Sequence, residues 1–230
     1  MRNLSSLLLS GVVMLATSIQ PGQAQAPGSP SVYVVTYLEV APASARQASG
    51  LLRQFAAGTR KEDGNFELTA LHEIGRPGHF AMVEAWRDKA ALDAHGAAMK
   101  ALGDRLQPLF LSPFDPRTFL PLAVAVPQTG ADLSNAVYVL THVDVFPAGK
   151  DDTAAMIKQL TEDSPKDAGS QRFDAVIQDG RPNHFHLIEA WADRKSREAH
   201  AAADHTKNFR AKLVPFEGAL YDERLYEVVK

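Results

Sequence analysis

The chain carries one sequence pattern twice, at a constant offset of 105 residues. The matching segments are 32–36 (VYVVT) with 137–141 (VYVLT), 75–80 (GRPGHF) with 180–185 (GRPNHF), and 84–86 (EAW) with 189–191 (EAW). Solenoid arrays need at least three short repeats, whereas a copy of about 90 residues is large enough for a core of its own. The repeat therefore predicts two units of one fold, joined as a covalent dimer.

Each copy predicts the element order β-α-β-β-α-β. The elements of the first copy are a strand at 32–40, a helix at 43–61, strands at 66–74 and 79–86, a helix after Asp88, and a strand at 118–124. Residues 75–78 (GRPG) have the turn residues of a hairpin. Ser44, Asp88 and Asp193 are predicted helix caps. This order is the split βαβ, or ferredoxin-like, unit.

Two helices on one face of such a sheet leave its other face uncovered. An uncovered apolar face must be buried, and packing the two sheets against each other achieves this within one chain. The predicted fold class is α+β, with two tandem ferredoxin-like units packed sheet to sheet as an intrachain dimeric α+β barrel. The predicted divisions are a signal peptide at 1–24, a first repeat at 31–124, a linker at 125–135 and a second repeat at 136–230.

The first 24 residues have the pattern of a secretory signal peptide. Arg2 supplies a positive charge, residues 4–19 form a mostly apolar run, and residues 22–24 (GQA) resemble a cleavage site. The run is short for a membrane span and no stop-transfer segment follows it, although an uncleaved anchor is the alternative. The expected location is the periplasm or the cell exterior, with no membrane contact after cleavage.

The composition excludes several functional classes. The chain has no cysteine, which rules out thiol catalysis, iron–sulfur clusters and thiolate metal sites. It has 24 basic and 27 acidic residues, a net charge of −3, and this balance provides no electrostatic attraction for nucleic acid or anionic lipid. Neither is an expected partner.

Candidate site residues lie on the third strand and second helix of each copy. Side chains alternate along a strand, so one face of the third strand carries Phe80, Met82, Glu84 and Trp86. On the helix that follows, His95 and Met99 share the apolar stripe. Strand and helix are therefore expected to border one cavity.

The second copy repeats the three polar members of this set. Trp86 and Trp191 are called the motif tryptophans below, His95 and His200 the motif histidines, and Glu84 and Glu189 the motif glutamates. From the first strand of each copy, Tyr37 and its counterpart His142 are expected to reach the same cavity.

Residues 84–95 (EAWRDKAALDAH) resemble the signature stretch of the antibiotic biosynthesis monooxygenase family, and residues 189–200 are a looser second example. The family includes small quinol monooxygenases and haem-degrading monooxygenases. The resemblance covers nearly all of the chain after the first 30 residues, twice. It implies ferredoxin-like dimers, and for the enzymes it implies oxidation of aromatic substrates by O₂ without flavin or metal. The deprotonated substrate then supplies the electrons.

Such chemistry needs an apolar pocket for a flat aromatic, a base, and exclusion of water. The motif tryptophans are expected to wall the substrate, the motif histidines to take its proton, and the motif glutamates to orient a histidine or a substrate hydroxyl. Further substrate contacts are expected from Phe80, Met82, Met99, Tyr37 and His142. The expected partners are a small aromatic and O₂, with no cofactor. If one copy alone is active, the first is favoured, because its helix is more apolar.

Haem degradation and metal binding are disfavoured. The haem-degrading relatives use an asparagine on the first strand, where this chain has Tyr37 and His142. His184 and His186 share a strand face but have no evident third ligand. His200 and His205 are five residues apart on one predicted helix, too far around it to chelate an ion. No metal site is expected.

Two other functions remain open. The motif tryptophans, glutamates and histidines also fit a structural role, as core residues with their polar atoms satisfied. The chain is then either a non-catalytic periplasmic protein that binds a small aromatic or haem-like ligand, or a structural or stress-response barrel with filled cores. An open cavity beside the motif tryptophans would favour the enzyme.

Overall fold

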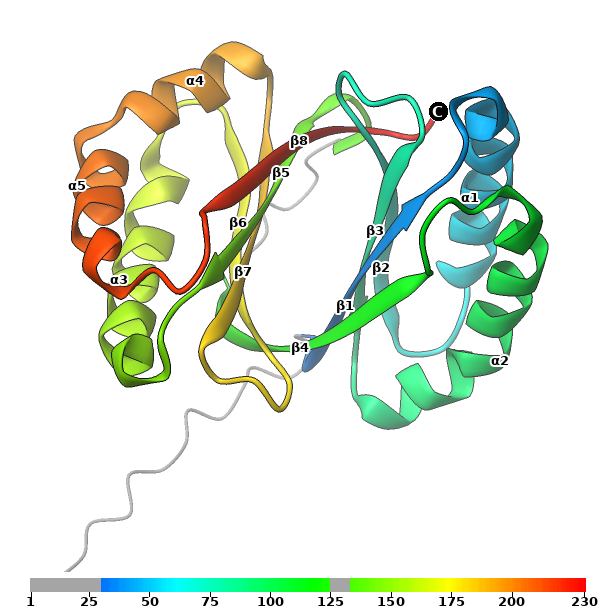
Figure 1. Cartoon of the computed structure of the whole chain (residues 1–230), viewed down its shortest axis with the longest axis horizontal. Helices are drawn as coiled ribbons and strands as arrows, with labels where there is room; N and C mark the ends of the chain where they lie inside the picture. The colour runs from blue at the N-terminus through cyan, green and yellow to red at the C-terminus, as the bar shows by residue number, and fades with distance from the viewer. Residues whose placement is uncertain (1–29, 125–132) are drawn as a thin grey trace, which may run out of the picture.

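The structure is a computed structural model that describes residues 30–124 and 133–230 (Figure 1). The predicted signal peptide at 1–24 and most of the predicted linker lie outside these ranges. The strands are β1 (Val32–Glu39), β2 (Asn65–Glu73), β3 (His79–Trp86), β4 (Asp115–Val124), β5 (Val137–Asp144), β6 (Ser170–Gln178), β7 (His184–Trp191) and β8 (Asp222–Val228). The helices are α1 (Ala45–Thr59), α2 (Lys89–Leu106), α3 (Lys150–Asp163), α4 (Arg194–Ala202) and α5 (Asp204–Leu213).

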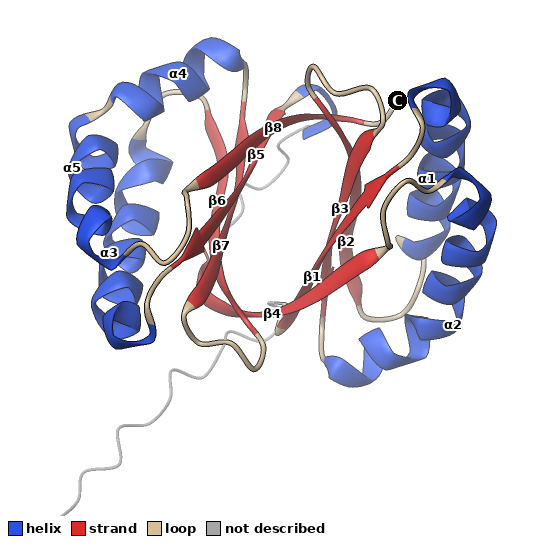
Figure 2. Cartoon of the chain, viewed as in Figure 1, coloured by secondary structure: helices blue, strands red, loops and turns tan. Residues whose placement is uncertain are grey.

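The strands close into one barrel in the order β1-β3-β2-β8-β5-β7-β6-β4 (Figure 2). Two of the antiparallel pairings join the halves, β2 with β8 and β4 with β6. The fourth strand of each half also pairs with the first strand of the same half: β4 pairs with β1, and β8 pairs with β5. The predicted α+β barrel is confirmed, and its halves are joined by strand hydrogen bonds as well as by packed faces.

The barrel has two apolar layers. One fills its interior, with buried members that include Tyr33, Val35, Phe119, Tyr138 and Tyr226. The other lies between the sheet and the helices, which cover the outside of the barrel on two opposite sides (Figure 1). The sheet face that the sequence left uncovered is therefore buried inside the barrel. Within the described residues, no helix has the length and apolar character needed to cross a lipid bilayer.

A buried ion cluster inside the barrel joins the two halves. Arg172 on β6 donates to the carboxylate of Glu67 on β2 at 2.7 Å and to Asp174 at 2.8 Å. Only 10% of the Arg172 side chain is exposed, so its positive charge depends on these two carboxylates rather than on water. Burial also raises the pKa of Tyr33 and, to about 12, that of Tyr138.

Local sequence signals explain the ends of the elements. Asp88 accepts a hydrogen bond from Ala91 N at 2.8 Å, and Asp193 caps α4 in the same way, as predicted. Ser44 stands at the predicted start of α1 but makes no side-chain cap, because residues 42–44 form a 3-10 turn. At the hairpin loops Gly75 and Gly180 have φ angles of +85° and +73°, which favour glycine.

The second half departs from the prediction of one continuous second helix. α2 runs unbroken through the first half, whereas its counterpart is divided into α4 and α5. The division is at Ala203, whose backbone is extended (φ −66°, ψ 149°). The second copy gains two residues after His200. A helix turn cannot absorb two extra residues without rotating its apolar stripe, so the break keeps Phe209 and Leu213 buried.

Candidate functional site

The structure brings the three motif residues of the first half together between the sheet and the helices. Trp86 Nε1 donates to Glu84 Oε2 at 3.0 Å, and the Trp86 and His95 rings lie 4.7 Å apart between centroids. None of the three residues is more than 1% exposed. β3 places the first two side chains on one face, and the turn capped by Asp88 brings the apolar stripe of α2 over them.

His95 lies between two carboxylates. Its Nδ1 is 2.8 Å from Glu62 Oε2, and its Nε2 is 3.6 Å from Glu84 Oε2. A carboxylate only accepts hydrogen bonds, so Nδ1 carries the proton in the neutral ring and Nε2 keeps a free lone pair. Nε2 makes no hydrogen bond within the described part of the chain. The imidazole is thus oriented as a base whose accepting nitrogen faces the buried Glu84 carboxyl.

Glu84 has an unusual protonation equilibrium. Burial raises the pKa of this carboxyl to about 7, and the negative charge of Glu62 adds to the rise, while the hydrogen bond from Trp86 opposes it. Its Oε1 has no hydrogen-bond partner among the described residues. A carboxyl that titrates near neutral pH beside an imidazole can exchange protons with a bound hydroxyl group.

The second half repeats the arrangement. Trp191 Nε1 donates to Glu189 Oε2 at 2.8 Å, and the Trp191 and His200 rings stack at 4.5 Å. His200 Nδ1 lies 2.7 Å from Asp167 Oδ2. Burial raises the pKa of Glu189 to about 7 and lowers that of His200.

Sequence reasoning missed the carboxylates that hold the motif histidines. Glu62 and Asp167 stand 105 residues apart, at equivalent positions of the two copies. Both follow the first helix of their half, where a carboxylate has no apolar periodicity to mark it as part of a site. The sequence does contain one sign of them: both copies have an acidic residue at this equivalent position.

Tyr37 and His142 lie elsewhere, so the expectation that they reach the cavity of the motif residues is wrong. Tyr37 faces the barrel interior, where its hydroxyl is 2.8 Å from His186 Nε2. The His142 ring stacks on His186 at 4.5 Å. The cause is strand register: Tyr37 pairs with Ala81 of β3, whose side chain also faces inward, opposite to that of Trp86.

Phe80, Met82 and Met99 lie in the same layer as the motif residues. They belong to the large apolar cluster between the sheet and α1 and α2, whereas Trp86 forms a smaller cluster with Val32, Ala91 and Leu92. Phe80 and Met82 are buried, and Met99 is partly buried. They therefore lie in the layer where substrate contacts were predicted, and no substrate contact is established for them.

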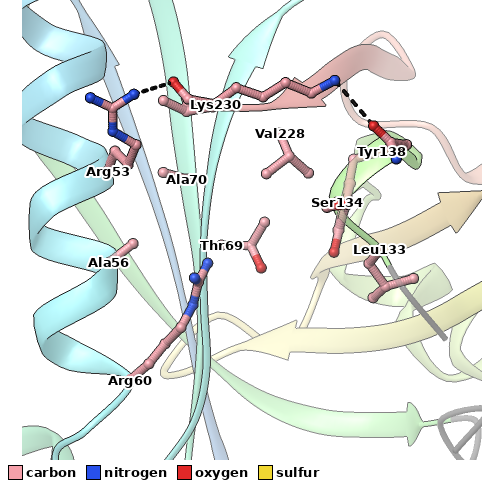
Figure 3. Close-up of a pocket in the computed structure, with 12 residues that line it drawn as sticks. Arg53, Ala56, Arg60, Thr69, Ala70, Leu133, Ser134, Tyr138, Val228 and Lys230 are labelled. Atoms are coloured by element: carbon pink, nitrogen blue, oxygen red, sulfur yellow. Dashed lines mark hydrogen bonds between the residues drawn. The ribbon is translucent and has the colours of Figure 1, made fainter. Parts of the chain in front are cut away.

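Two cavities are found away from the motif. One of about 580 Å³ lies between α1, β2, β8 and the turn Leu133–Asn135, and its lining includes Arg53, Arg60 and Lys230 (Figure 3). The other, of about 710 Å³, lies at one mouth of the barrel, beside Arg117 and His184. Neither is lined by a motif residue. The Trp86 and His95 rings pack directly on each other, so the expectation of an open hollow between them is wrong for this pair, and such close packing is what the structural alternative expects.

One group of side chains in the described residues has the composition of a metal site. It consists of Asp167, His200 and His205, whose potential ligand atoms all lie within 4.8 Å of one another. The sequence prediction that His200 and His205 cannot act together assumed one continuous helix, and the break at Ala203 overturns it.

Comparison with known proteins identifies relatives of this fold. The antibiotic biosynthesis monooxygenase family matches residues 31–100 and 136–212, together more than half of the chain. No curated protein sequence matches the chain.

Several solved structures cover both halves. A proposed monooxygenase from Fusobacterium nucleatum has a TM-score of 0.78 at 18% identity, over 88% of this chain and 94% of that one. A second, from Lactobacillus acidophilus, has a TM-score of 0.72 at 15% identity, over 87% and 95%. An anthrone oxidase-like protein has a TM-score of 0.66 at 11% identity, over 88% and 93%. At these identities the likeness shows a shared fold.

Proposed function

Because the chain belongs to the antibiotic biosynthesis monooxygenase family, we propose that it is an exported enzyme that oxidises a quinol or related phenol with O₂. The observation that carries the proposal is the buried His95, oriented by Glu62 and in contact with Trp86. The N-terminal signal pattern is the basis for export. The reaction is assigned first to the first half, where the accepting nitrogen of the histidine makes no hydrogen bond to the described residues.

The first step is removal of a phenolic proton. The substrate hydroxyl gives its proton to His95 Nε2, while the hydrogen bond from Nδ1 to Glu62 fixes the tautomer and stabilises the imidazolium that forms. Trp86 offers a flat apolar surface for the ring. A dry environment favours reaction of the anion with O₂ rather than with solvent.

The electrons for oxygen reduction come from the substrate. A phenol and O₂ give a quinone and water, and a quinol and O₂ give a hydroxyquinone and water. One oxygen atom enters the ring, as a carbonyl in the quinone or as the hydroxyl of the hydroxyquinone, and the other leaves as water with two hydrogens taken from the substrate. Both equations balance without an external reductant, so the protein needs to supply only a base, a pocket and exclusion of water.

The substrate must open the layer to reach His95. The Phe55 ring on α1 lies 5.4 Å from the His95 ring and is only partly buried. Phe55 is the partly buried neighbour of the imidazole, whereas Trp86 on the other side is fully buried, so we infer that the substrate enters by displacing Phe55. Loop and side-chain movements of this size are common on substrate binding.

Oxygen consumption tests the proposal. Hydroquinones and naphthohydroquinones, prepared without air and assayed with a chelator, are expected to be oxidised by the wild type, with one atom of labelled O₂ entering the product. His95→Ala should lower the rate by about 100-fold or more. His79→Ala, on β3, is the matched control, since His79 pairs with Glu39 near the surface.

Two results would reject the proposal. One is an uptake rate that His95→Ala leaves unchanged. The other is a quinol that raises the melting temperature and is recovered unaltered, which indicates a binding protein.

For export, expression of the whole chain in a Gram-negative host should yield a periplasmic product that begins after Ala24.

A further inference from the structure

The second half contains a cluster of two histidines and one carboxylate that the proposed oxidation does not use. His200 Nδ1 lies 2.7 Å from Asp167 Oδ2, and His205 Nε2 lies 3.2 Å from the same oxygen. His200 is 5% exposed, and about a quarter of each of the other two side chains is exposed. The cluster is thus anchored on the core and open on one side.

The break between α4 and α5 creates this cluster. On a continuous helix, residues five apart point in directions about 140° apart and cannot share a ligand. The extended backbone at Ala203 lets α5 begin anew, and the His200 and His205 rings then lie 5.4 Å apart. In the first half α2 is continuous, and the ionisable groups recorded beside the histidine among the described residues are Glu62 and Glu84.

We propose that Asp167, His200 and His205 bind a divalent transition-metal ion of the zinc type in the second half of the chain. Imidazole nitrogen and carboxylate oxygen are the ligands that this class of ion takes, and three of them leave one position for water. This site is independent of the oxidation proposed for His95, since it uses none of the first-half residues.

The geometry needs only small changes to hold the ion. Zinc–ligand bonds of roughly 2.0–2.2 Å in a tetrahedral arrangement separate the ligand atoms by about 3.4 Å. Two of the separations here are 2.7 and 3.2 Å, and the third is no more than 4.8 Å. Rotation of the partly exposed Asp167 and His205 side chains suffices, while His200 stays fixed by its stacking on Trp191.

Two further features favour an ion over a simple ion pair. His205 Nε2 is a buried atom without a hydrogen bond of good geometry to any described residue, although it faces Asp167. Thr206 Oγ1 lies 3.4 Å from both ring nitrogens of His200, so a polar group borders the cluster beside that ring. A metal ion would satisfy His205 Nε2 directly.

Calorimetric titration with Zn²⁺ tests the site on the whole chain, expressed without a polyhistidine tag and stripped with a chelator. The wild type is expected to bind one ion, and Co²⁺ should give visible absorption bands of a four-coordinate site. His205→Gln should weaken Zn²⁺ binding by more than about 10-fold. His184→Gln is the control, because its partner Asp144 at 2.7 Å forms a similar pair outside the cluster.

The proposal fails if the wild type binds no stoichiometric ion, or if His205→Gln binds as the wild type does. It also fails if His184→Gln lowers the affinity equally. Circular dichroism shows that each variant is folded, and Asp167→Asn is a second variant with the same expected loss. If the wild type binds Zn²⁺ as expected but does not oxidise quinols, the proposed function is rejected and the proposed metal site stands.

Discussion

Replacing Glu84 by glutamine should make the stability of the protein less dependent on pH. The Glu84 carboxyl has a pKa of about 7 in the folded protein against an ordinary value of 4.5, because it is buried. A raised carboxyl pKa means that the folded state holds its proton more tightly than the unfolded state does. The stabilisation is therefore fully present below pH 4.5 and is lost as the pH rises to about 7.

The size of the effect follows from the difference in pKa. Each pKa unit corresponds to about 1.4 kcal/mol, so the shift from 4.5 to about 7 amounts to about 3 kcal/mol. Glutamine has the same shape, keeps an oxygen to accept from Trp86 Nε1, and does not ionise. The groups around it, His95 and Glu62, are the same in both proteins.

Urea unfolding followed by far-ultraviolet circular dichroism gives the required free energies at pH 4.5, 5.5, 6.5 and 7.5. Relative to the wild type, Glu84→Gln should gain about 3 kcal/mol between the lowest and the highest pH. Glu198→Gln, on the exposed surface of α4, should give a curve parallel to the wild type. A constant difference between Glu84→Gln and the wild type across this range would refute the argument from burial.

Three further changes test the barrel and its helices by urea unfolding. Arg172→Met should cost about 3–5 kcal/mol, because the buried carboxylate of Asp174 and the partly buried carboxylate of Glu67 lose this cation; a cost below 1 kcal/mol would contradict this. Tyr37→Phe should cost about 1 kcal/mol through loss of the hydrogen bond to His186, and no change would mean that water replaces it. Asp88→Ala should cost about 1 kcal/mol through loss of the α2 cap, an effect absent if the first turn frays.

The fold was largely predictable because its signals are local and occur twice. The strand at 79–86 and the caps Asp88 and Asp193 were placed from alternation and residue type, and the structure has them there. The sequence did not predict the pairings of β2 with β8 and of β4 with β6, because these depend on which edge strands of the two sheets meet when the barrel closes. No local pattern encodes that choice.

The site was predictable only in part, for a reason of register. Alternation correctly grouped Glu84 with Trp86 on one face of β3. It could not relate the faces of two different strands, because a shift of one residue in pairing exchanges the faces, and so Tyr37 was placed on the wrong side. The break at Ala203 was missed because the insertion alone does not show whether the helix continues with a rotated apolar stripe or breaks, and the burial of Phe209 decides between them.

The contacts between halves explain what fusion in one chain makes possible. In a symmetric dimer, a residue near the two-fold axis meets its own copy. Here Glu67 meets Arg172 and Tyr37 lies 5.2 Å from His142, and each pair stands 105 residues apart, at equivalent positions of the repeat. Two copies of the first half would bring two partly buried Glu67 carboxylates together, a repulsion that a single chain avoids by changing one of them. The same freedom lets His205 appear in one half alone, so covalent duplication accounts both for the stability of the interior and for the difference between the two candidate sites.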